Sequence, residues 1–288
     1  MTIDMHIHSK ASDGKLTVKE IFKEAKRRSI LFMAITDHDS VGCQIQAIEG
    51  AKKEAIRYVT GVELNVTFTH PTYHEGKPVS LDFLGYQFDA GNKPLQSKLE
   101  LMAKYREERA LKILYNLNEV FRKEETTELT MDDLRQIEES VDGVLGRPHI
   151  ADYLVKKNIV KTRQEAFDKY LVKCDVPKYP LYIEDASKIV RDAGGKLVLA
   201  HPNDPHGTSL TSLTKSLAEQ TSIIQEKMLP YIDGVECWHS RNTQETTKHY
   251  IAFARKHELI MTGGTDCHQK PIIMGTVQIP DWVADQFA

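Results

Sequence analysis

Short apolar runs alternate with helical patterns through the first third of the chain. Residues 31–35 form a continuous apolar run, which is typical of a strand buried on both faces. A capping-box sequence at residues 17–20 precedes apolar residues at helical spacing. A helical pattern over residues 41–55 and a strand pattern over residues 58–62 follow. The alternation predicts an α/β fold with parallel strands joined by crossover helices.

The middle of the chain has a different pattern. Over residues 94–182, helical periodicity continues without a strand pattern. From residue 183 to the C-terminus, strand and helix patterns alternate again. We therefore expect one α/β domain built from residues 1–93 and 183–288, interrupted by a helical insertion subdomain over residues 94–182.

Polar side chains occupy the first predicted strand, where a buried strand would carry apolar ones. Alternate residues of a strand point to the same side, so His6 and His8 would face one point, with Asp4 beside them. Two neutral imidazoles on one face are suited to binding a divalent cation. The alternative is a hydrogen-bonded pair of core histidines.

Residues of metal-ligand type also follow the other predicted strands, at the point where each strand ends. The carboxyl ends of parallel strands meet at one edge, where α/β enzymes build their sites, so we expect these side chains to gather there. They are Asp13, Asp37, His38, Asp39, Glu63, His201, Glu236, His239, Asp266 and His268. Glu236 has a second interpretation as the partner of a neighbouring cation, and His239 has one as a surface residue.

The residue types narrow the choice of metal. The candidates are imidazoles and carboxylates, while the four cysteines are scattered without a C-x-x-C pair, as in a reduced cytosolic protein. Mixed nitrogen and oxygen ligands suit Mn, Zn or Fe better than they suit Mg or Ca. The candidates are too many for one ion, so a bridging carboxylate such as Glu63 or Asp266 would join two or three ions.

The charge balance gives no bulk argument for nucleic-acid or membrane binding, because the formal net charge is -3. The charged run at residues 104–109 is interpreted as a solvated helix face. The chain has no apolar run of membrane-span length and begins without a signal-sequence pattern. We therefore expect a cytoplasmic location and no membrane partner. No pattern assigns an oligomeric state.

Taken in their order along the chain, these motifs resemble the PHP (polymerase and histidinol phosphatase) family of phosphoesterases. The resemblance spans nearly the whole chain. A Gly-Arg-Pro-His motif inside a helical insertion is similar to the family branch that acts on nucleotide phosphates, including 3',5'-bisphosphates and the 5' ends of short RNA. The matching segments are Asp4-x-His6-x-His8 with Asp13-Gly14, Thr36-Asp37-His38-Asp39, Gly61-Val62-Glu63, Gly146-Arg147-Pro148-His149-Ile150-Ala151, Ala200-His201-Pro202, Gly234-Val235-Glu236 and Gly264-Thr265-Asp266-Cys267-His268.

The resemblance implies a distorted (β/α)7 TIM-like barrel with two to three divalent ions at its mouth, covered by the helical insertion. Mn is the expected metal, with Fe or Zn as alternatives. It also implies that a metal-activated hydroxide attacks the phosphorus of a small phosphorylated substrate, above all a nucleotide. The implied ligands are His6, His8, Glu63 and Asp266 for the first ion, Glu63 and His149 for the second, and Asp13, His38 and His268 for the third.

Catalytic and substrate-binding roles also follow from the resemblance. His201 would orient the phosphate or protonate the leaving oxygen, and it is a catalytic candidate together with the ligand Asp266. Arg147 would pair bidentately with phosphate, and Arg241 is a second candidate for that role.

One position departs from the family pattern. Family members usually carry a histidine in a His-x-Leu-Gly-Tyr run after the Gly-Val-Glu motif, and here that run begins with Asp82. A carboxylate also binds Mn, Fe or Zn, so we expect Asp82 to replace the histidine as a ligand. The alternative is that His70 or His74 supplies the missing ligand from residues 67–77, a stretch that could also form a lid.

The sequence thus predicts a metal-dependent phosphomonoesterase that acts on nucleotides or related small phosphates. Two other reactions are alternatives: 5'-to-3' exonuclease action on short RNA, and amidohydrolase-type C–N hydrolysis. A metal-stabilised scaffold without activity is a further alternative. The exonuclease would need an open groove for a strand, and no interleaving of basic and aromatic residues indicates one.

Overall fold

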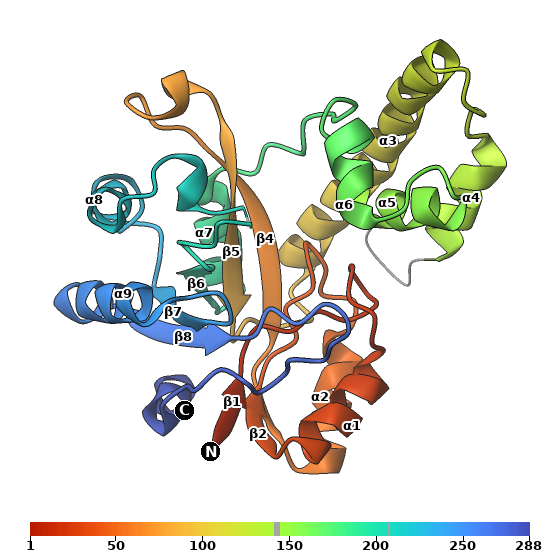
Figure 1. Ribbon diagram of the computed structural model, residues 1–288. Coiled ribbons are helices and arrows are strands. Elements are labelled where there is room, and N and C mark those ends of the chain that lie inside the picture. Colours follow the sequence, from red (N-terminus) through yellow and green to blue (C-terminus); the bar gives the residue numbers. More distant parts are fainter. Residues whose placement is uncertain (141–144, 207) are drawn as a thin grey trace.

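The strands form two sheets. A computed structural model describes residues 1–140, 145–206 and 208–288 (Figure 1). One sheet has the parallel order β1 (Thr2–Asp4), β2 (Ile30–Met33) and β3 (Arg57–Tyr58). The other has the order β4 (Gly61–Phe68), β5 (Val79–Tyr86), β6 (Lys196–Leu199), β7 (Gly234–His239) and β8 (Ile260–Gly264). The mixed α/β class predicted from the sequence is confirmed.

Isolated parallel bridges join the two sheets at both edges. Beyond the ends of β1 and β8, Ile7 pairs with Cys267. On the other side, His38 after β2 pairs with Glu63 in β4. As a result, the loops that follow β1, β2 and β8 meet beside β4, where many of the predicted ligands lie.

The pairing of β4 with β5 differs from the predicted parallel arrangement. The two strands form an antiparallel hairpin over their full lengths, and β5 is also antiparallel to β6. The connection, residues 69–78, is too short for the crossover helix that parallel neighbours need. The predicted strand at residues 58–62 is divided, because β3 ends at Tyr58 and β4 begins at Gly61. Parallel pairing holds for the first sheet and for β6, β7 and β8.

Helices surround the sheets. α1 spans Val18–Arg27 and α2 spans Gln44–Glu54. The predicted capping box is confirmed: the Thr17 hydroxyl accepts from the Glu20 N–H, and the Glu20 carboxylate accepts from the Thr17 N–H at 2.8 Å. On the second sheet, α7 and α9 pack against strands and α8 packs against α9. These helices are α7 (Ile183–Asp192), α8 (Leu217–Lys227) and α9 (Gln244–Lys256).

The remaining α-helices and one π-helical turn form a block beside the sheets, residues 93–171, which we call the helical block (Figure 1). Its apolar side chains form a core separate from the core of the sheets, in which the ring of Phe121 meets that of Tyr170 edge-on at 5.1 Å. None of the helices in the described ranges combines the length and the apolar character needed to cross a membrane. The block contains α3 (Lys93–Lys123), α4 (Met131–Glu139), α5 (Arg147–Lys156), α6 (Arg163–Ala166) and a π-helical turn, Phe167–Leu171.

Ion pairs hold the helical block against the loops of the sheets. The Arg106 guanidinium in α3 pairs with the Asp39 carboxylate after β2, and both side chains are largely buried. On the other flank, the Lys15 ammonium lies 2.6 Å from the Asp152 carboxylate in α5. α3 also packs on the core of the sheets through Leu95. The block therefore lies over the loops that follow β1 and β2.

Asp133 joins α4 to α5 inside the helical block. Its carboxylate accepts from the Thr130 N–H at 2.7 Å and from the Tyr153 hydroxyl at 2.6 Å, and it lies 2.7 Å from the Lys157 ammonium. Burial raises the pKa of Asp133, but these partners outweigh burial and hold that pKa below its ordinary value. The ionised carboxylate therefore stabilises the fold above the ordinary aspartate pKa of about 4, and this stabilisation is lost as the pH falls.

We expect Asp133→Asn to lower the free energy of unfolding by about 1–3 kcal/mol at neutral pH, because buried donors lose a charged acceptor. Urea unfolding measures this difference, which should shrink as the solution is acidified below the ordinary aspartate pKa of about 4. Asp132→Asn is the matched control, since that neighbouring carboxylate is exposed and pairs only at the surface. An effect of Asp133→Asn that did not depend on pH would contradict the role of its charge.

Candidate metal centre

Four ligand atoms converge beside β4, where β1 and β8 end. His6 and His8 follow β1, Glu63 lies in β4 and Asp266 follows β8; we call them the His6 group. The Nε2 atoms of His6 and His8 are 3.2 Å apart, and they lie 3.3 and 3.1 Å from Glu63 Oε2. The same nitrogens lie 3.3 and 3.2 Å from Asp266 Oδ1. Ligand atoms at about 2.0–2.1 Å from a tetrahedral ion are about 3.3–3.4 Å apart, so these four atoms fit one divalent ion.

Glu236 in β7 fixes the orientation of His6. Because a carboxylate only accepts, Glu236 Oε1 receives the proton of His6 Nδ1 at 3.0 Å, and the imidazole lone pair is on Nε2, facing the other ligands. The second oxygen of Glu236 accepts from the backbone N–H of His201 at 2.7 Å. Burial raises the pKa of Glu236, but His6 outweighs burial and lowers it. Glu236 therefore orients a candidate ligand.

A second set of ligand atoms surrounds Asp13. Asp13, His8, His38 and His268 form this set, which we call the Asp13 group. Asp13 Oδ1 is 3.2 Å from His268 Nε2 and 3.9 Å from both His38 Nε2 and His8 Nδ1. Asp266 Oδ1 lies 3.4 Å from His268 Nδ1 and connects this group to the His6 group. The structure thus brings together the three residues that the resemblance assigned to one ion.

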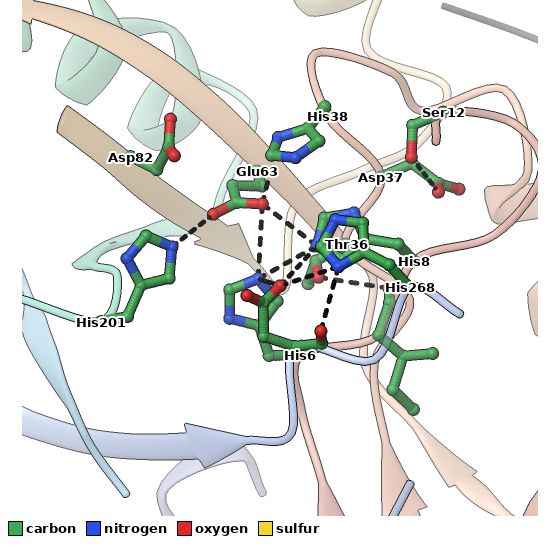
Figure 2. Close-up of polar contacts among 12 residues, drawn as sticks. His6, His8, Ser12, Thr36, Asp37, His38, Glu63, Asp82, His201 and His268 are labelled. Carbon is green, nitrogen blue, oxygen red and sulfur yellow. Dashed lines mark hydrogen bonds and ion pairs between the residues drawn. The ribbon is translucent and has the colours of Figure 1, made fainter. Parts of the chain in front are cut away.

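Glu63, Asp82 and His201 form a third set, which we call the Asp82 group. Glu63 Oε1 lies 3.0 Å from His201 Nε2, and the side-chain amide of Asn65 donates to Asp82 Oδ1 at 2.5 Å. Figure 2 shows Asp82 and His201 on one side of Glu63 and His8 and His268 on the opposite side, with His38 above Glu63 and His6 below it. One carboxylate therefore presents Oε2 to the His6 group and Oε1 to the Asp82 group.

The loop histidines do not join this set in the part of the chain that the structure describes. His74 is exposed beyond the end of β4, with Nδ1 3.4 Å from the Lys77 carbonyl. His70 is buried against the ring of Tyr73, and its Nε2 lies 3.7 Å from the Glu226 carboxylate in α8. Of the alternatives for the missing ligand, the structure places Asp82 beside Glu63.

Two predicted residues make contacts that the resemblance did not imply, although both line the neighbouring pocket. His149, expected as a ligand, caps the start of α5, where its Nδ1 accepts from the Gly146 N–H at 3.0 Å. It belongs to none of the ligand sets formed by residues 1–140, 145–206 and 208–288, and it lines the neighbouring pocket. His201, expected to contact phosphate, turns its Nε2 to Glu63 within the Asp82 group.

His239 and Arg241 lie at the far side of Asp266. His239, Asp204 and Asp266 form a further set of ligand type, with His239 Nε2 3.7 Å from Asp266 Oδ2. Asp204 already pairs with the Arg241 guanidinium, which also lines the pocket. Because a cationic side chain already balances Asp204, we do not assign an ion to this set.

Several buried polar atoms in the three groups have no hydrogen-bond partner among the described residues. They include His8 Nδ1, Asp13 Oδ1, Glu63 Oε2 and His201 Nδ1. Unpaired polar atoms in a protein interior are unfavourable, so convergent sets of them indicate a missing partner. Imidazole nitrogens and carboxylate oxygens at these spacings fit divalent metal ions.

The ionisation of each group depends on its neighbours. Burial lowers the pKa of His201, but the adjacent Glu63 carboxylate outweighs burial and raises that pKa to about 9. Burial also lowers the pKa of His268, whereas neighbouring carboxylates, led by Asp13, raise it to about 10. The pKa of Asp82 is raised to about 6 by burial and by the charge of Glu63. The carboxylates of the site thus attract positive charge, which metal ions would supply in place of protons.

The three groups line a pocket of about 630 Å³, a volume in the range of small-ligand sites. The lining is also rich in cationic side chains, and many of them come from the helical block. The cationic side chains that line the pocket are Arg106, Arg109, Arg147, Arg163, Lys178, Arg241 and Lys270.

Arg106 and Arg109 correct the interpretation of residues 104–109 as a solvated helix face. The two arginines are three positions apart on α3, so they share a face, and both line the pocket. Arg109 is only 5% exposed. Its guanidinium pairs with the Asp175 carboxylate, whose second oxygen lies 2.6 Å from the Arg147 guanidinium. The lysine and the glutamates of the run are exposed as expected.

The sequence profile of the PHP domain matches residues 4–174, more than half of the chain. The chain belongs to the PHP family. This confirms the resemblance derived from the ligand motifs.

PHP relatives with named activities cover most of the chain. A 3',5'-nucleoside bisphosphate phosphatase of Chromobacterium violaceum is 27% identical over 282 residues, covering 92% of this chain and 87% of that protein. A 5'-3' exoribonuclease of Haemophilus influenzae is 29% identical over 206 residues, covering 69% and 68%. The 5'-3' exoribonuclease Rnm of Escherichia coli is 27% identical over 278 residues, covering 92% and 85%.

Solved structures share the fold of this PHP protein over nearly its full length. A crystal structure of a metal-dependent phosphoesterase from Bifidobacterium adolescentis superposes with a TM-score of 0.79 and 26% identity, covering 99% of this chain and 94% of that one. A structure of an amidohydrolase from Chromobacterium violaceum gives a TM-score of 0.80 at 24% identity, covering 98% and 93%. The second likeness bears on the fold alone.

Sequence reasoning on this PHP protein missed residues whose roles depend on long-range packing. Lys178 lies in the segment that leaves the helical block, and no local pattern places it in the pocket wall. Asn65 reads as an ordinary strand residue, yet it faces Asp82 across the hairpin because the two are register partners. An antiparallel hairpin between β4 and β5 would have predicted that contact.

Proposed function

We propose that this PHP protein is a metal-dependent phosphomonoesterase whose substrates are nucleotides, in particular nucleoside 3',5'-bisphosphates. The observation that carries the proposal is the pocket, whose lining combines residues of all three ligand groups with seven cationic side chains. A phosphate ester needs both, because its charge must be neutralised and its phosphorus exposed to attack. The name of the Chromobacterium violaceum relative supports the choice of substrate.

Two to three divalent ions, with manganese as the expected metal, would occupy the His6, Asp13 and Asp82 groups. Ions bound there would neutralise phosphate charge and acidify a water molecule near neutral pH. The protein itself fixes the positions of the ligand atoms. Glu63 and Asp266 hold the groups at fixed separations, and Glu236 sets the lone pair of His6. His201 acts as a ligand in this arrangement, in place of the proton donor expected from the resemblance.

The two sheets act together as one distorted β/α barrel, and the helical segment over residues 94–182 is an insertion that covers its mouth. The bridges at both sheet edges support the first statement. The second is supported by the pocket lining, because α3, α5 and the segment after the π-helical turn all contribute side chains to it.

A second phosphate on the substrate would meet the basic wall. Arg109 and Arg147 share the Asp175 carboxylate, so their guanidinium groups lie close together. Among the described residues Lys178 has no ion-pair partner, and burial with nearby arginines lowers its pKa to about 8 despite Asp82. A nucleoside monophosphate bound at the ligand groups would leave these cations unused. The wall therefore favours a bisphosphate.

A second candidate function is 5'-to-3' exoribonuclease action on short RNA, the activity named for the Haemophilus influenzae and Escherichia coli relatives. Binding a single strand without sequence preference uses a series of aromatic stacking platforms. Among the described residues, the pocket lining contains one phenylalanine, tyrosine or tryptophan side chain, that of Phe167. The Arg147 guanidinium lies 5.5 Å from the centre of its ring. One platform suits a single nucleotide.

Product formation by manganese-loaded protein, measured as phosphate, mononucleotide or amine released, tests the proposal. The substrates are adenosine 3',5'-bisphosphate, AMP, a 5'-phosphorylated RNA oligomer and a panel of amides. We expect fastest release from the bisphosphate. Preferred release of mononucleotides from the RNA would favour the exoribonuclease. Cleavage of amides alone, or no reaction with metal content verified, would overturn the phosphoesterase and leave the C–N hydrolase or the scaffold.

We expect Arg147→Gln to raise KM for adenosine 3',5'-bisphosphate by about 10- to 100-fold, since a charged hydrogen bond contributes about 1.5–3 kcal/mol. KM for AMP should change much less, because AMP carries no second phosphate. Steady-state kinetics on both substrates measures the two effects. Arg135→Gln is the control, as this arginine is exposed on α4 away from the pocket. Equal increases for both substrates would place Arg147 at the shared phosphate instead.

A further inference from the structure

The three ligand groups differ in their chemistry. The Asp13 group offers three imidazoles and one carboxylate, and the His6 group offers two of each. The Asp82 group offers two carboxylates and one imidazole. Within one pocket, the share of oxygen donors therefore rises from the Asp13 group to the Asp82 group. Glu63, which belongs to two of the groups, turns a different oxygen to each.

The Asp82 carboxylate is held in place by its surroundings. Its backbone is fixed in β5, where the Asp82 N–H donates to the Thr208 carbonyl and the Ala200 N–H donates to the Asp82 carbonyl, both at 3.1 Å. The Asn65 amide donates to Oδ1 at 2.5 Å, and the Asn65 N–H donates to Asp39 Oδ1 at 3.1 Å. The side chain is 5% exposed. The Asp82 carboxylate is thus a buried candidate metal ligand with a fixed orientation.

His201 completes the Asp82 group from the end of β6, the strand that pairs with β5. It follows β6, adopts φ 24°, and its backbone N–H is fixed by Glu236. A non-glycine residue at positive φ is strained and persists where the surroundings hold it. Its Nε2 faces Glu63 Oε1 at 3.0 Å, while its buried Nδ1 has no hydrogen-bond partner among the described residues. All three side chains are therefore positioned for one common ligand.

We propose that the Asp82 group selects manganese(II) against zinc relative to the other two groups, so that the loaded protein carries two kinds of metal ion. Carboxylate oxygens suit hard ions such as Mn²⁺, whereas imidazole-rich sets suit Zn²⁺. The inference rests on the metal sites of the proposed function and goes beyond it, because it assigns different ions to different groups. Asp82 is the residue that makes the difference.

Competitive loading tests this selectivity. Zn²⁺ binds most protein sites more tightly than Mn²⁺, so chelator-stripped protein is dialysed against Zn²⁺ in excess over its sites together with Mn²⁺ at about hundredfold higher concentration. Elemental analysis gives the bound metals, and electron paramagnetic resonance detects bound Mn²⁺. We expect wild type to retain about one Mn²⁺ per chain beside Zn²⁺. Wild type that binds zinc alone would overturn the proposal.

Variants at one position separate selectivity from folding. Asp82→His should exchange the bound Mn²⁺ for Zn²⁺ and lower the Mn-to-Zn ratio by about tenfold or more. The near-isosteric Asp82→Asn keeps an oxygen for the Asn65 amide and should lose Mn²⁺ without gaining Zn²⁺. Asp175→Asn removes a carboxylate that contacts two arginines and the Val176 N–H but no ligand group, and it should keep the wild-type metal content. An unchanged ratio in both Asp82 variants would overturn the proposal.

The outcome is independent of the proposed reaction. Protein that binds both metals in the expected ratio but releases no phosphate would retain the selectivity and refute the phosphomonoesterase. Protein that hydrolyses the bisphosphate but binds one kind of metal ion in all groups would support the phosphomonoesterase and refute the selectivity.

Discussion

Glu63→Gln is expected to abolish most of the phosphatase activity, with kcat/KM falling by about 100- to 1000-fold or more. Glu63 is fully buried and lies within 3.3 Å of His6, His8, His38 and His201. Glutamine keeps the shape but removes the charge and turns an amide group towards one of the ligand sets. Because Glu63 belongs to the His6 and Asp82 groups, metal analysis should also show a loss of about two ions per chain.

Glu107→Gln is the matched control for this prediction, because Glu107 is an exposed glutamate on α3. It should keep both metal content and activity. Full metal content with full activity in Glu63→Gln would refute the assignment of Glu63 as a shared ligand. Retained metal with lost activity would restrict its role to the reaction.

Gly264→Ala is expected to damage stability and metal binding together. A Cβ at Gly264 would lie 2.4 Å from both the backbone nitrogen and the Cβ of His6, closer than real Cβ contacts. The clash would push the end of β8 away from the segment after β1 and displace His6 from its group. We expect the free energy of unfolding to fall by about 1–3 kcal/mol and the metal affinity to fall by about 10- to 100-fold.

Urea unfolding with metal-free protein and metal titration measure the two parts of this prediction separately. Gly42→Ala provides the comparison, because the nearest atom to a Cβ there is Ser40 Oγ at 3.5 Å, an ordinary contact. That variant should resemble wild type in both measurements. A Gly264→Ala protein with wild-type stability and affinity would show that the end of β8 can yield to the added methyl group.

The convergence of the candidate ligands could be predicted from the sequence, because it depends on short-range pattern. His6 and His8 are two residues apart in an extended segment, so their convergence follows from the period of a strand. Glu63, His201 and Asp266 follow or sit within apolar runs, and the ends of strands gather at one edge. The structure indeed brings these residues together.

The parts that the sequence did not predict depend on long-range packing. The antiparallel β4–β5 hairpin was missed because residues 58–62 read as one strand and residues 67–77 were interpreted as a stretch that could form a lid. Arg106 and Arg109 were assigned to solvent because a charged helix face looks the same whether water or a pocket lies opposite. His149 was placed by the resemblance alone, and it caps its own helix instead of joining a ligand group.

His8 and Glu63 each belong to two of the three ligand groups. Such sharing makes the ion positions thermodynamically reciprocal, because whatever one ion gains from a neighbour's presence, the neighbour gains equally. An ion that fixes a common side chain lowers the ordering cost for the neighbour that shares it, and its departure loosens that neighbour. The affinity measured at one group would therefore depend on whether the adjoining group is occupied.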